Sequence, residues 1–342
     1  MIRMALEKLL AGADLTEAEA AGVMTQILEG RATQAQMAAY LVALRCKGES
    51  VSELVGSVRC MRRYALGVKS AAANAVDLCG TGGDGKCTFN ISTTAAFVVA
   101  GAGVEVAKHG NRAASSRCGS ADLLEELGVA LDLRPEHVAV CIAEASIGFM
   151  FAPVFHPAMK NIAPVRKELG VRTIFNMLGP LANPANVRRQ LIGVASADLV
   201  GKFAEVLQRL DAHSAVVVHS RGGYDEATTT HPSDVAVLRS GGTAMFTLEP
   251  AELGFAGAAG DSLMGGSPKE NAVITRRILA GEAGPRTDTV LLNAGLALWA
   301  AGAAADAAEG VALARESVES GNARERLDRL ARLSRSLAEK AA

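Results

Sequence analysis

Aromatic residues and surplus positive charge are both scarce in this chain. Phe, Tyr and Trp make up 4% of its 342 residues, and 35 lysines and arginines are balanced by 36 aspartates and glutamates. A protein that binds nucleic acid or a membrane surface through charge needs a cationic excess on one face. The composition therefore argues against both of these partners.

Long apolar runs and paired cysteines are also missing. The longest apolar runs, 95–104 and 294–305, are shorter than the roughly 20 residues that a membrane-spanning helix requires. No charged segment followed by an apolar one suggests an export signal. The six cysteines form no CxxC pair, which argues against a disulfide framework or a zinc site. We therefore expect a cytoplasmic protein whose cysteines, including Cys79, Cys87 and Cys118, are reduced.

The N-terminal segment is rich in helix-start signals. Thr16-x-x-Glu19, Thr33-x-x-Gln36 and Ser50-x-x-Glu53 each fit a capping box, and apolar residues at helical spacing follow each one. About four helices are predicted over residues 1–66. They could form a simple packed bundle or the contact face of a homodimer, and the sequence leaves both interpretations open.

Strands and helices alternate after the helical segment, which predicts an α/β fold with a mainly parallel sheet flanked by helices. We expect a helical domain at 1–70 and a larger α/β domain at 71–342. Segment 160–187 contains three prolines and is expected to pack on the N-terminal helices. The predicted strands are 75–79, 103–107, 147–150, 191–194, 214–219 and 243–248. The predicted helices of the α/β domain are 121–127, 136–145, 161–169, 196–210, 268–280, 288–302, 305–320 and 322–340.

A glycine-rich segment follows the first predicted strand. Glycines occupy positions 80, 82, 83 and 85, and the hydroxyl-rich stretch 88–94 then leads into an apolar helix. Glycines allow positive φ and close approach of backbone N–H groups, and a helix N-terminus favours negative charge. The second predicted strand is followed by Lys108, His109 and Arg112. Since such strand ends share one edge of a parallel sheet, a ligand with two phosphate groups is expected there.

Two further features have ordinary as well as functional interpretations. Asp225 and Glu226 follow strand 214–219, and an acidic pair in a loop is usually just solvated. At an edge that binds phosphate, however, the pair could hold Mg²⁺, which favours carboxylate and phosphate oxygens. Arg166 is the second feature, and its ordinary interpretation is an arginine that is exposed at the surface or ion-paired.

The glycines also fit the dinucleotide fingerprint Gly80-x-Gly82-x-x-Gly85, so an NAD-binding domain is a rival. Two details count against it. The polar stretch 86–90 separates the glycines from the helix, and the second strand ends in Lys108 and His109 where an acid would be expected. This context favours phosphates without a dinucleotide.

Three blocks, 80–93, 108–128 and 151–184, together with the acidic pair, resemble the anthranilate phosphoribosyltransferase family along almost the whole chain. The resemblance implies a small helical domain and a large α/β domain, usually in a homodimer. It also implies transfer of phosphoribose from 5-phosphoribosyl 1-diphosphate (PRPP) to the amine of anthranilate, with release of pyrophosphate, in tryptophan biosynthesis.

The resemblance also implies roles for individual residues. Ser92, Asp225 and Glu226 would hold Mg²⁺, as one or two ions. Gly80, Asn111 and Arg166 would bind anthranilate, and His109 is either a proton acceptor or a structural histidine. The residues implied for PRPP are Gly80, Gly83, Asp84, Thr88, Asn90, Ile91, Ser92, Thr93, Lys108, His109, Gly110, Asn111, Arg112, Ala113, Ala114, Ser115, Ser116 and Ser120.

Three alternatives remain at this point. One is a nucleoside phosphorylase of the same fold, the second is a dinucleotide enzyme, and the third is a non-catalytic relative that binds nucleic acid. The intact glycines and acids, and the slightly acidic net charge of −1, argue against the third.

Overall fold

The computed structural model describes residues 1–69, 74–113, 116–239 and 242–340. Its N-terminal part consists of the helices α1 (Ile2–Leu10), α2 (Glu17–Leu28), α3 (Gln34–Lys47) and α4 (Val51–Tyr64). The three predicted capping boxes are all present, at Thr16, Thr33 and Ser50, and they begin α2, α3 and α4. The prediction of about four helices is confirmed.

A single seven-stranded sheet forms the centre of the rest of the chain, in the order β3-β2-β1-β4-β5-β6-β7. The first five strands pair in parallel, and the last two add as antiparallel neighbours. The mainly parallel sheet is therefore confirmed. The strands are β1 (Val76–Gly80), β2 (Val106–Gly110), β3 (Ile147–Phe151), β4 (Arg189–Gly193), β5 (Ser214–Ser220), β6 (Ser233–Arg239) and β7 (Gly242–Leu248).

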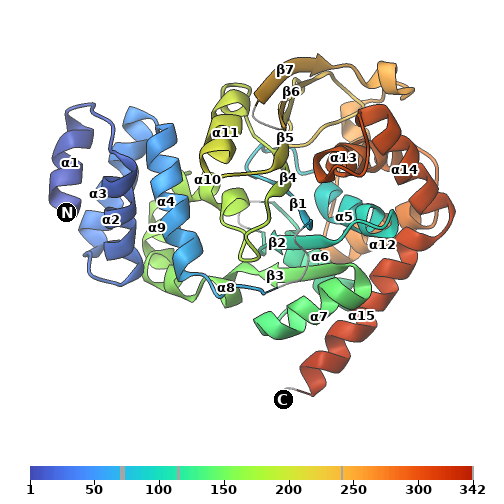
Figure 1. Cartoon of the computed structure of the whole chain (residues 1–342), viewed down its shortest axis with the longest axis horizontal. Helices are drawn as coiled ribbons and strands as arrows, with labels where there is room; N and C mark the ends of the chain where they lie inside the picture. Colours follow the sequence, from blue (N-terminus) through green and yellow to red (C-terminus); the bar gives the residue numbers. More distant parts are fainter. Residues whose placement is uncertain (70–73, 114–115, 240–241, 341–342) are drawn as a thin grey trace.

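Each face of the sheet has its own hydrophobic core, because successive strand residues point to opposite sides. Leu191 and Val216 belong to the core on the face covered by α5 (Ile91–Gly101), α13 (Pro285–Ala301), α14 (Ala307–Glu319) and α15 (Asn322–Glu339). Ile192 and Val217 belong to the other core, which contains α11 (Asp198–Arg209) and the N-terminal helices. Figure 1 shows α1–α4 at one end of the molecule and α13–α15 at the other.

The proline-containing excursion packs on the N-terminal helices. It contains a 3₁₀ turn (Pro157–Asn161), α9 (Ala163–Leu169) and α10 (Ile174–Leu181). Ile162, Ile174 and Leu178 share one core with Leu41 of α3. The boundary between the two domains near residue 70 lies outside the described residues and stays a prediction. The remaining helical elements are α6 (Ser120–Glu126), α7 (Pro135–Ala145), α8 (Ala152–Phe155), α12 (Pro268–Leu279) and the 3₁₀ turns Pro250–Leu253 and Gly260–Leu263.

Two strand predictions were wrong. β6 was missed, because its apolar centre, 235–238, lies between polar residues and is specified by pairing with β5. The second strand was predicted at 103–107, but β2 begins at Val106, since Val106 pairs with Ile147 of β3. Lys108 and His109 therefore lie within the strand and are buried. No helix in the described parts of the chain is long and apolar enough to cross a membrane.

Candidate functional site

The glycine loop joins β1 to α5 and folds around the side chain of Asp225. Gly82 and Gly83 have φ of 68° and 75°, which confirms the expected left-handed backbone. The N–H of Gly82 donates to Oδ2 of Asp225 at 2.6 Å. A Cβ on Gly80 would collide with the same carboxylate, so only glycine fits at the end of β1. The glycine motif and Asp225 are thus joined by a hydrogen bond and by close packing.

The acidic pair lies under the loop, with Asp225 buried and Glu226 half-buried. Asp225 is 8% exposed, and its backbone lies so close to Gly193 of β4 that a side chain there would collide with it. Oε1 of Glu226 accepts a hydrogen bond from the N–H of Ser92, in the first turn of α5, at 3.2 Å. The ordinary interpretation of a solvated surface pair is therefore wrong. The structure brings Ser92, Asp225 and Glu226 together.

The carboxylates of this cluster lack enough positive charge to balance them. Burial, reinforced by repulsion from Asp84, raises the pKa of Asp225 to about 7. Burial and repulsion from Asp225 raise the pKa of Glu226 to about 8. Oδ2 of Asp84 is buried and has no hydrogen-bond partner among the described residues. Carboxylate oxygens are hard donors, and too little positive charge lies nearby to balance these. Such a group of oxygens suits Mg²⁺. In the described part of the chain they do not form a complete metal cage, so substrate or water oxygens would have to complete the coordination.

Lys108 lies inside the sheet and does not project from its edge. Its Nζ donates to the carbonyl of Leu78 at 2.5 Å, and the residue is 2% exposed. Its charge favours the ionised forms of Asp77 and Glu226, although burial outweighs it and raises the pKa of both carboxyls. The positive charge of Lys108 therefore acts on the carboxyl groups of Asp77 and Glu226, which lie close to the glycine loop.

His109 lies on the opposite side of β2 and faces the 157–181 excursion. Its Nδ1 is 3.3 Å from the carbonyl oxygen of Gly179, and its ring centroid is 5.0 Å from that of His156. Nε2 of each ring is buried without a partner among the described residues. Burial lowers the pKa of His109 to about 3 and that of His156 to about 4. Such low values favour a structural role for His109 over that of a proton acceptor.

The two buried histidines should make the protein less stable in mild acid. The unfolded chain protonates them near pH 6.5, whereas the folded chain keeps them neutral down to about pH 4. Their contribution is therefore complete above pH 6.5 and is lost as the pH falls below it. His109→Gln should reduce the loss of unfolding free energy between about pH 7 and about pH 5 by on the order of 1 kcal/mol. Denaturant unfolding measures this difference, and His213→Gln, at an exposed histidine, is the control. Equal pH dependence in wild type and both variants would contradict the prediction.

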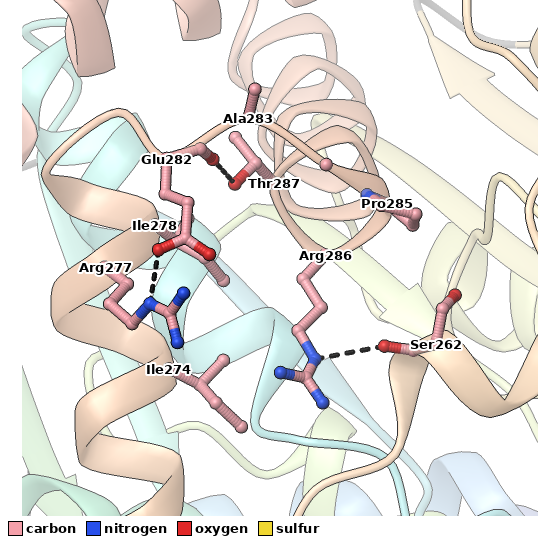
Figure 2. A pocket seen from close by; sticks show the side chains of 10 residues that line it. Ser262, Ile274, Arg277, Ile278, Glu282, Ala283, Pro285, Arg286 and Thr287 are labelled. Atoms are coloured by element: carbon pink, nitrogen blue, oxygen red, sulfur yellow. Dashed lines mark hydrogen bonds and ion pairs between the residues drawn. The ribbon is translucent and has the colours of Figure 1, made fainter.

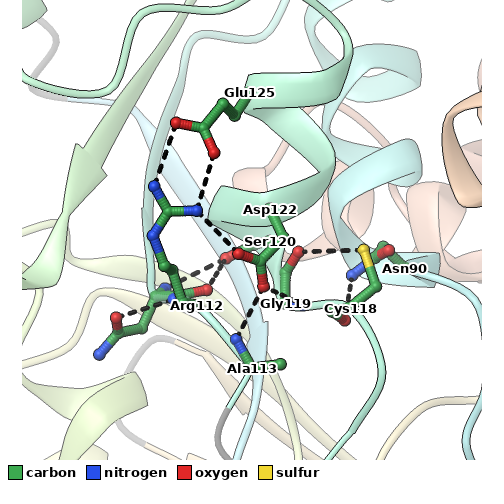
Figure 3. Close-up of polar contacts among 9 residues, drawn as sticks. Asn90, Arg112, Ala113, Cys118, Gly119, Ser120, Asp122 and Glu125 are labelled. Atoms are coloured by element: carbon green, nitrogen blue, oxygen red, sulfur yellow. Dashed lines mark hydrogen bonds and ion pairs between the residues drawn. The ribbon is translucent and has the colours of Figure 1, made fainter. Parts of the chain in front are cut away.

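The second loop, after β2, is closed by acidic side chains of α6 (Figure 3). The guanidinium of Arg112 binds Asp122 at 2.9 Å and Glu125 at 2.8 Å. Oδ2 of Asp122 accepts from the backbone N–H of Ala113 at 2.9 Å. Oγ of Ser120 bonds to the backbone N–H and carbonyl of Asn111, both at 3.2 Å. These carboxylates engage three of the five N–H donors of the Arg112 guanidinium.

Several predicted residues stand apart from these contacts. Ala114 and Ser115 lie outside the described residues. Oγ of Ser116 donates to the carbonyl of Cys118, which lies just before α6 begins. Thr93 is buried in the first turn of α5, and Ile91 is packed in the core beneath the site. The cysteines near the site are free thiols, as expected, and burial raises the pKa of Cys79 and Cys118.

Asn90 has a role that the sequence did not predict. It occupies the N-cap position of α5, but its side chain does not cap the helix. Its Nδ2 donates to the carbonyl of Cys118 at 3.1 Å, and its Oδ1 accepts from Asn271 of α12 at 2.8 Å. Glu226 takes over the capping contact with Ser92. Asn90 therefore ties the glycine loop to the second loop.

Arg166 is available to an acidic ligand. The residue is half-buried, its guanidinium lies 5.0 Å from the centre of the Phe175 ring, and no carboxylate of the described residues pairs with it. The interpretation as an ion-paired arginine is therefore wrong. Nearby, Nη1 of Arg172 donates to the carbonyl of Gly83 at 2.8 Å, which links the excursion to the glycine loop. No signal in the sequence pointed to Phe175 or Arg172.

Comparison with known proteins bears on the whole chain. Residues 72–324 match the a/b domain of a glycosyl transferase family, and residues 3–65 match the helical bundle domain of such a family. An anthranilate phosphoribosyltransferase of Rubrobacter xylanophilus is 53% identical over 339 residues, which is 99% of each chain. One of Thermomicrobium roseum is 54% identical over 343 residues, again 99% of each. The chain belongs to the anthranilate phosphoribosyltransferase family.

Solved structures of this family have the same fold. The anthranilate phosphoribosyltransferase of Thermus thermophilus superimposes with a TM-score of 0.92 at 46% identity, over 97% of this chain and 99% of that one. The enzyme of Saccharomyces cerevisiae, in a complex with PRPP and Mg, gives 0.89 at 27% identity, over 98% of both chains. A yeast complex with 4-fluoroanthranilate gives 0.88 at 26% identity, with the same coverage. The family and the fold predicted from the sequence blocks are confirmed.

Proposed function

We propose that this protein transfers the phosphoribosyl group of PRPP to the amine of anthranilate. The products are N-(5-phosphoribosyl)anthranilate and pyrophosphate, and the reaction is the second step of tryptophan biosynthesis from chorismate. It is a pentosyl transfer that uses Mg²⁺. The observation that carries the proposal is the pair Asp225–Glu226, of which Asp225 is bonded to the glycine loop and Glu226 to the first turn of α5.

We assign the diphosphate of PRPP to the glycine loop and the α5 N-terminus. Backbone N–H groups at Gly83, Thr88, Asn90 and Thr93, together with the side chains of Thr88 and Ser92, would donate to its oxygens. The second loop, from Gly110 to Ser120, would complete the phosphate contacts. Ser92, Asp225 and Glu226 would hold one or two Mg²⁺ ions, with Asp84 beside them.

The chemistry that follows depends on stabilising a leaving group. Ser92, Asp225 and Glu226 would hold Mg²⁺, which would supply positive charge to balance the negative charge of a departing diphosphate. The chain's own N–H donors at the glycine loop and the α5 N-terminus stabilise the same charge, without reorganising, as C1 of the ribose becomes oxocarbenium-like. The neutral aromatic amine then attacks C1 from the opposite face with inversion, as the C1–O bond to the diphosphate breaks. It needs no strong base beforehand, because its proton can leave after the C–N bond has formed, to water or to the released pyrophosphate. This suits a His109 that stays neutral.

We assign the anthranilate carboxylate to Arg166, with Asn111 and Gly80 close to the ring and amine. A guanidinium forms two parallel hydrogen bonds with a carboxylate, and the Phe175 ring fixes the orientation of that fork. The partly buried position of Arg166 strengthens the interaction by limiting competition from water.

We further propose a cytoplasmic homodimer with a helical domain at 1–70, on which the 160–187 segment packs, and an α/β domain at 71–342. Exposed apolar side chains lie on the N-terminal helices, including Met4, Leu10 and Val42, at 69%, 78% and 41% exposure. Burial of such residues in a second copy would be favourable. Sedimentation of the wild type and of Leu10→Glu tests this arrangement.

The proposed function is tested by following anthranilate fluorescence with PRPP and Mg²⁺. The expected result is a loss of fluorescence that requires the protein, PRPP and Mg²⁺ together. No loss, with exchange of a nucleobase for phosphate instead, would identify a nucleoside phosphorylase and overturn the proposal.

A further inference from the structure

A short segment after β7 pairs with the glycine loop. We call residues 262–266 the strap. The N–H of Phe89 donates to the carbonyl of Leu263 at 3.1 Å, and the N–H of Gly265 donates to the carbonyl of Cys87 at 2.9 Å. Thr88 and Met264 form the antiparallel bridge between these bonds. The last part of the glycine loop and the strap are thus joined by one antiparallel bridge and its two backbone hydrogen bonds.

The outer edge of the strap is bound by one side chain. Arg286, the second residue of α13, donates from Nε to the carbonyl of Ser262 at 3.0 Å and from Nη2 to the carbonyl of Met264 at 2.9 Å. Figure 2 shows the guanidinium reaching the strap at Ser262. The carbonyls of Ser262 and Met264 thus face Arg286, whereas the carbonyl of Leu263 and the N–H of Gly265 face the glycine loop.

The strap and the glycine loop are in tight backbone contact. A Cβ on Gly265 would lie 2.7 Å from both N and Cα of Phe89, which is backbone that cannot yield cheaply. The next strap residue, Gly266, donates its N–H to Oδ1 of Asn271 at 2.7 Å, and Asn271 holds Asn90. A displacement of the strap would therefore move Thr88, Phe89 and Asn90 together.

The two hydrogen bonds to the strap are the polar contacts of the Arg286 side chain among the described residues. It borders a cavity of about 190 Å³ between α12 and α13, and no carboxylate among the described residues pairs with it. Arg277 lines the same cavity, but among the described residues its side chain bonds to Glu282 and not to the strap. Arg277 is therefore a matched control for charge and location.

We propose that Arg286 is a positioning residue for PRPP, acting through the strap on the loop that carries Thr88 and Asn90. The inference rests on the proposed function, because it concerns the phosphate site of that reaction. Arg286 does not touch the substrate. Its guanidinium binds the outer carbonyls of the strap, at Ser262 and Met264. It thereby fixes the position in which the strap pairs with the glycine loop.

Steady-state kinetics of Arg286→Ala, Arg286→Lys, Gly265→Ala and Arg277→Ala test the proposal. In Arg286→Ala, KM for PRPP should rise by about tenfold, with kcat and KM for anthranilate within about twofold of wild type. Arg286→Lys should rescue part of the effect, because an ammonium can reach one carbonyl but cannot span both. Gly265→Ala should also raise KM for PRPP, because the added methyl group would push the strap away from the glycine loop. Arg277→Ala should match wild type.

Hydrogen exchange at the amides of Phe89 and Gly265 gives a second readout that needs no substrate. Both should exchange faster in Arg286→Ala and not in Arg277→Ala, while the melting temperature records any general loss of stability. Unchanged KM for PRPP, or unchanged exchange at both amides, would overturn the inference. If wild type itself lacks turnover, the proposed function fails, whereas the exchange data still decide whether Arg286 positions the loop.

Discussion

Asp225→Asn combined with Glu226→Gln should lower kcat by about a hundredfold or more at saturating PRPP, anthranilate and Mg²⁺. The substitutions keep the size of both side chains and remove both negative charges. The amide oxygens can still accept from Gly82 and Ser92, so the loop and α5 should keep their places. What is lost is the ability to hold a divalent cation beside the diphosphate. Initial rates measured over a range of Mg²⁺ concentrations check the result.

Two comparisons separate this effect from unfolding. In metal-free buffer near pH 8 the double variant should melt no lower than wild type, because burial raises the pKa of both acids and makes their charged forms costly. Mg²⁺ should raise the melting temperature of wild type and not that of the variant. Asp234→Asn, which removes a carboxylate paired with the exposed Arg221, should leave turnover unchanged. Wild-type rates in the double variant would remove the pair from the mechanism.

Arg166→Ala should raise KM for anthranilate by about tenfold or more and leave KM for PRPP within about twofold. The guanidinium is the unpaired, half-buried cation beside Phe175 in the described part of the chain, and a charge-assisted fork to a carboxylate is strong in such surroundings. Arg166→Lys should fall between wild type and Arg166→Ala, because it keeps the charge but loses the planar fork.

The control for Arg166 is Lys167→Ala, on the same helix but exposed to solvent. It should leave both KM values unchanged. Titration with benzoate as a competitive inhibitor adds a test with a ligand that lacks the amine. Arg166→Ala should weaken benzoate inhibition as much as it raises KM for anthranilate. Equal increases in KM for anthranilate and PRPP would contradict the assignment of Arg166.

Local signals in the sequence were enough to predict much of the framework. The capping boxes at Thr16, Thr33 and Ser50 predicted where helices begin, because a cap depends on residues only three positions apart. The glycines predicted a left-handed loop for the same reason, since φ is a property of single residues. The long blocks around them were specific enough to indicate the family.

Contacts between distant segments decided the rest. β2 lies three residues later than predicted, because its register depends on β3, and this shift buries Lys108 and His109 on opposite faces. The sequence placed Asp225 in a loop at the phosphate-binding edge, but it contained no local sign that the N–H of Gly82 would bond to its carboxylate. Arg286 and Gly265 also have no local signature, since their partners are backbone atoms far away in the chain. The sequence by itself determined where the capped N-terminal helices begin and which chemical groups the site contains. Only the tertiary structure decided how they face one another, because hydrogen-bond geometry, burial and the resulting pKa shifts all depend on neighbours that are remote in sequence.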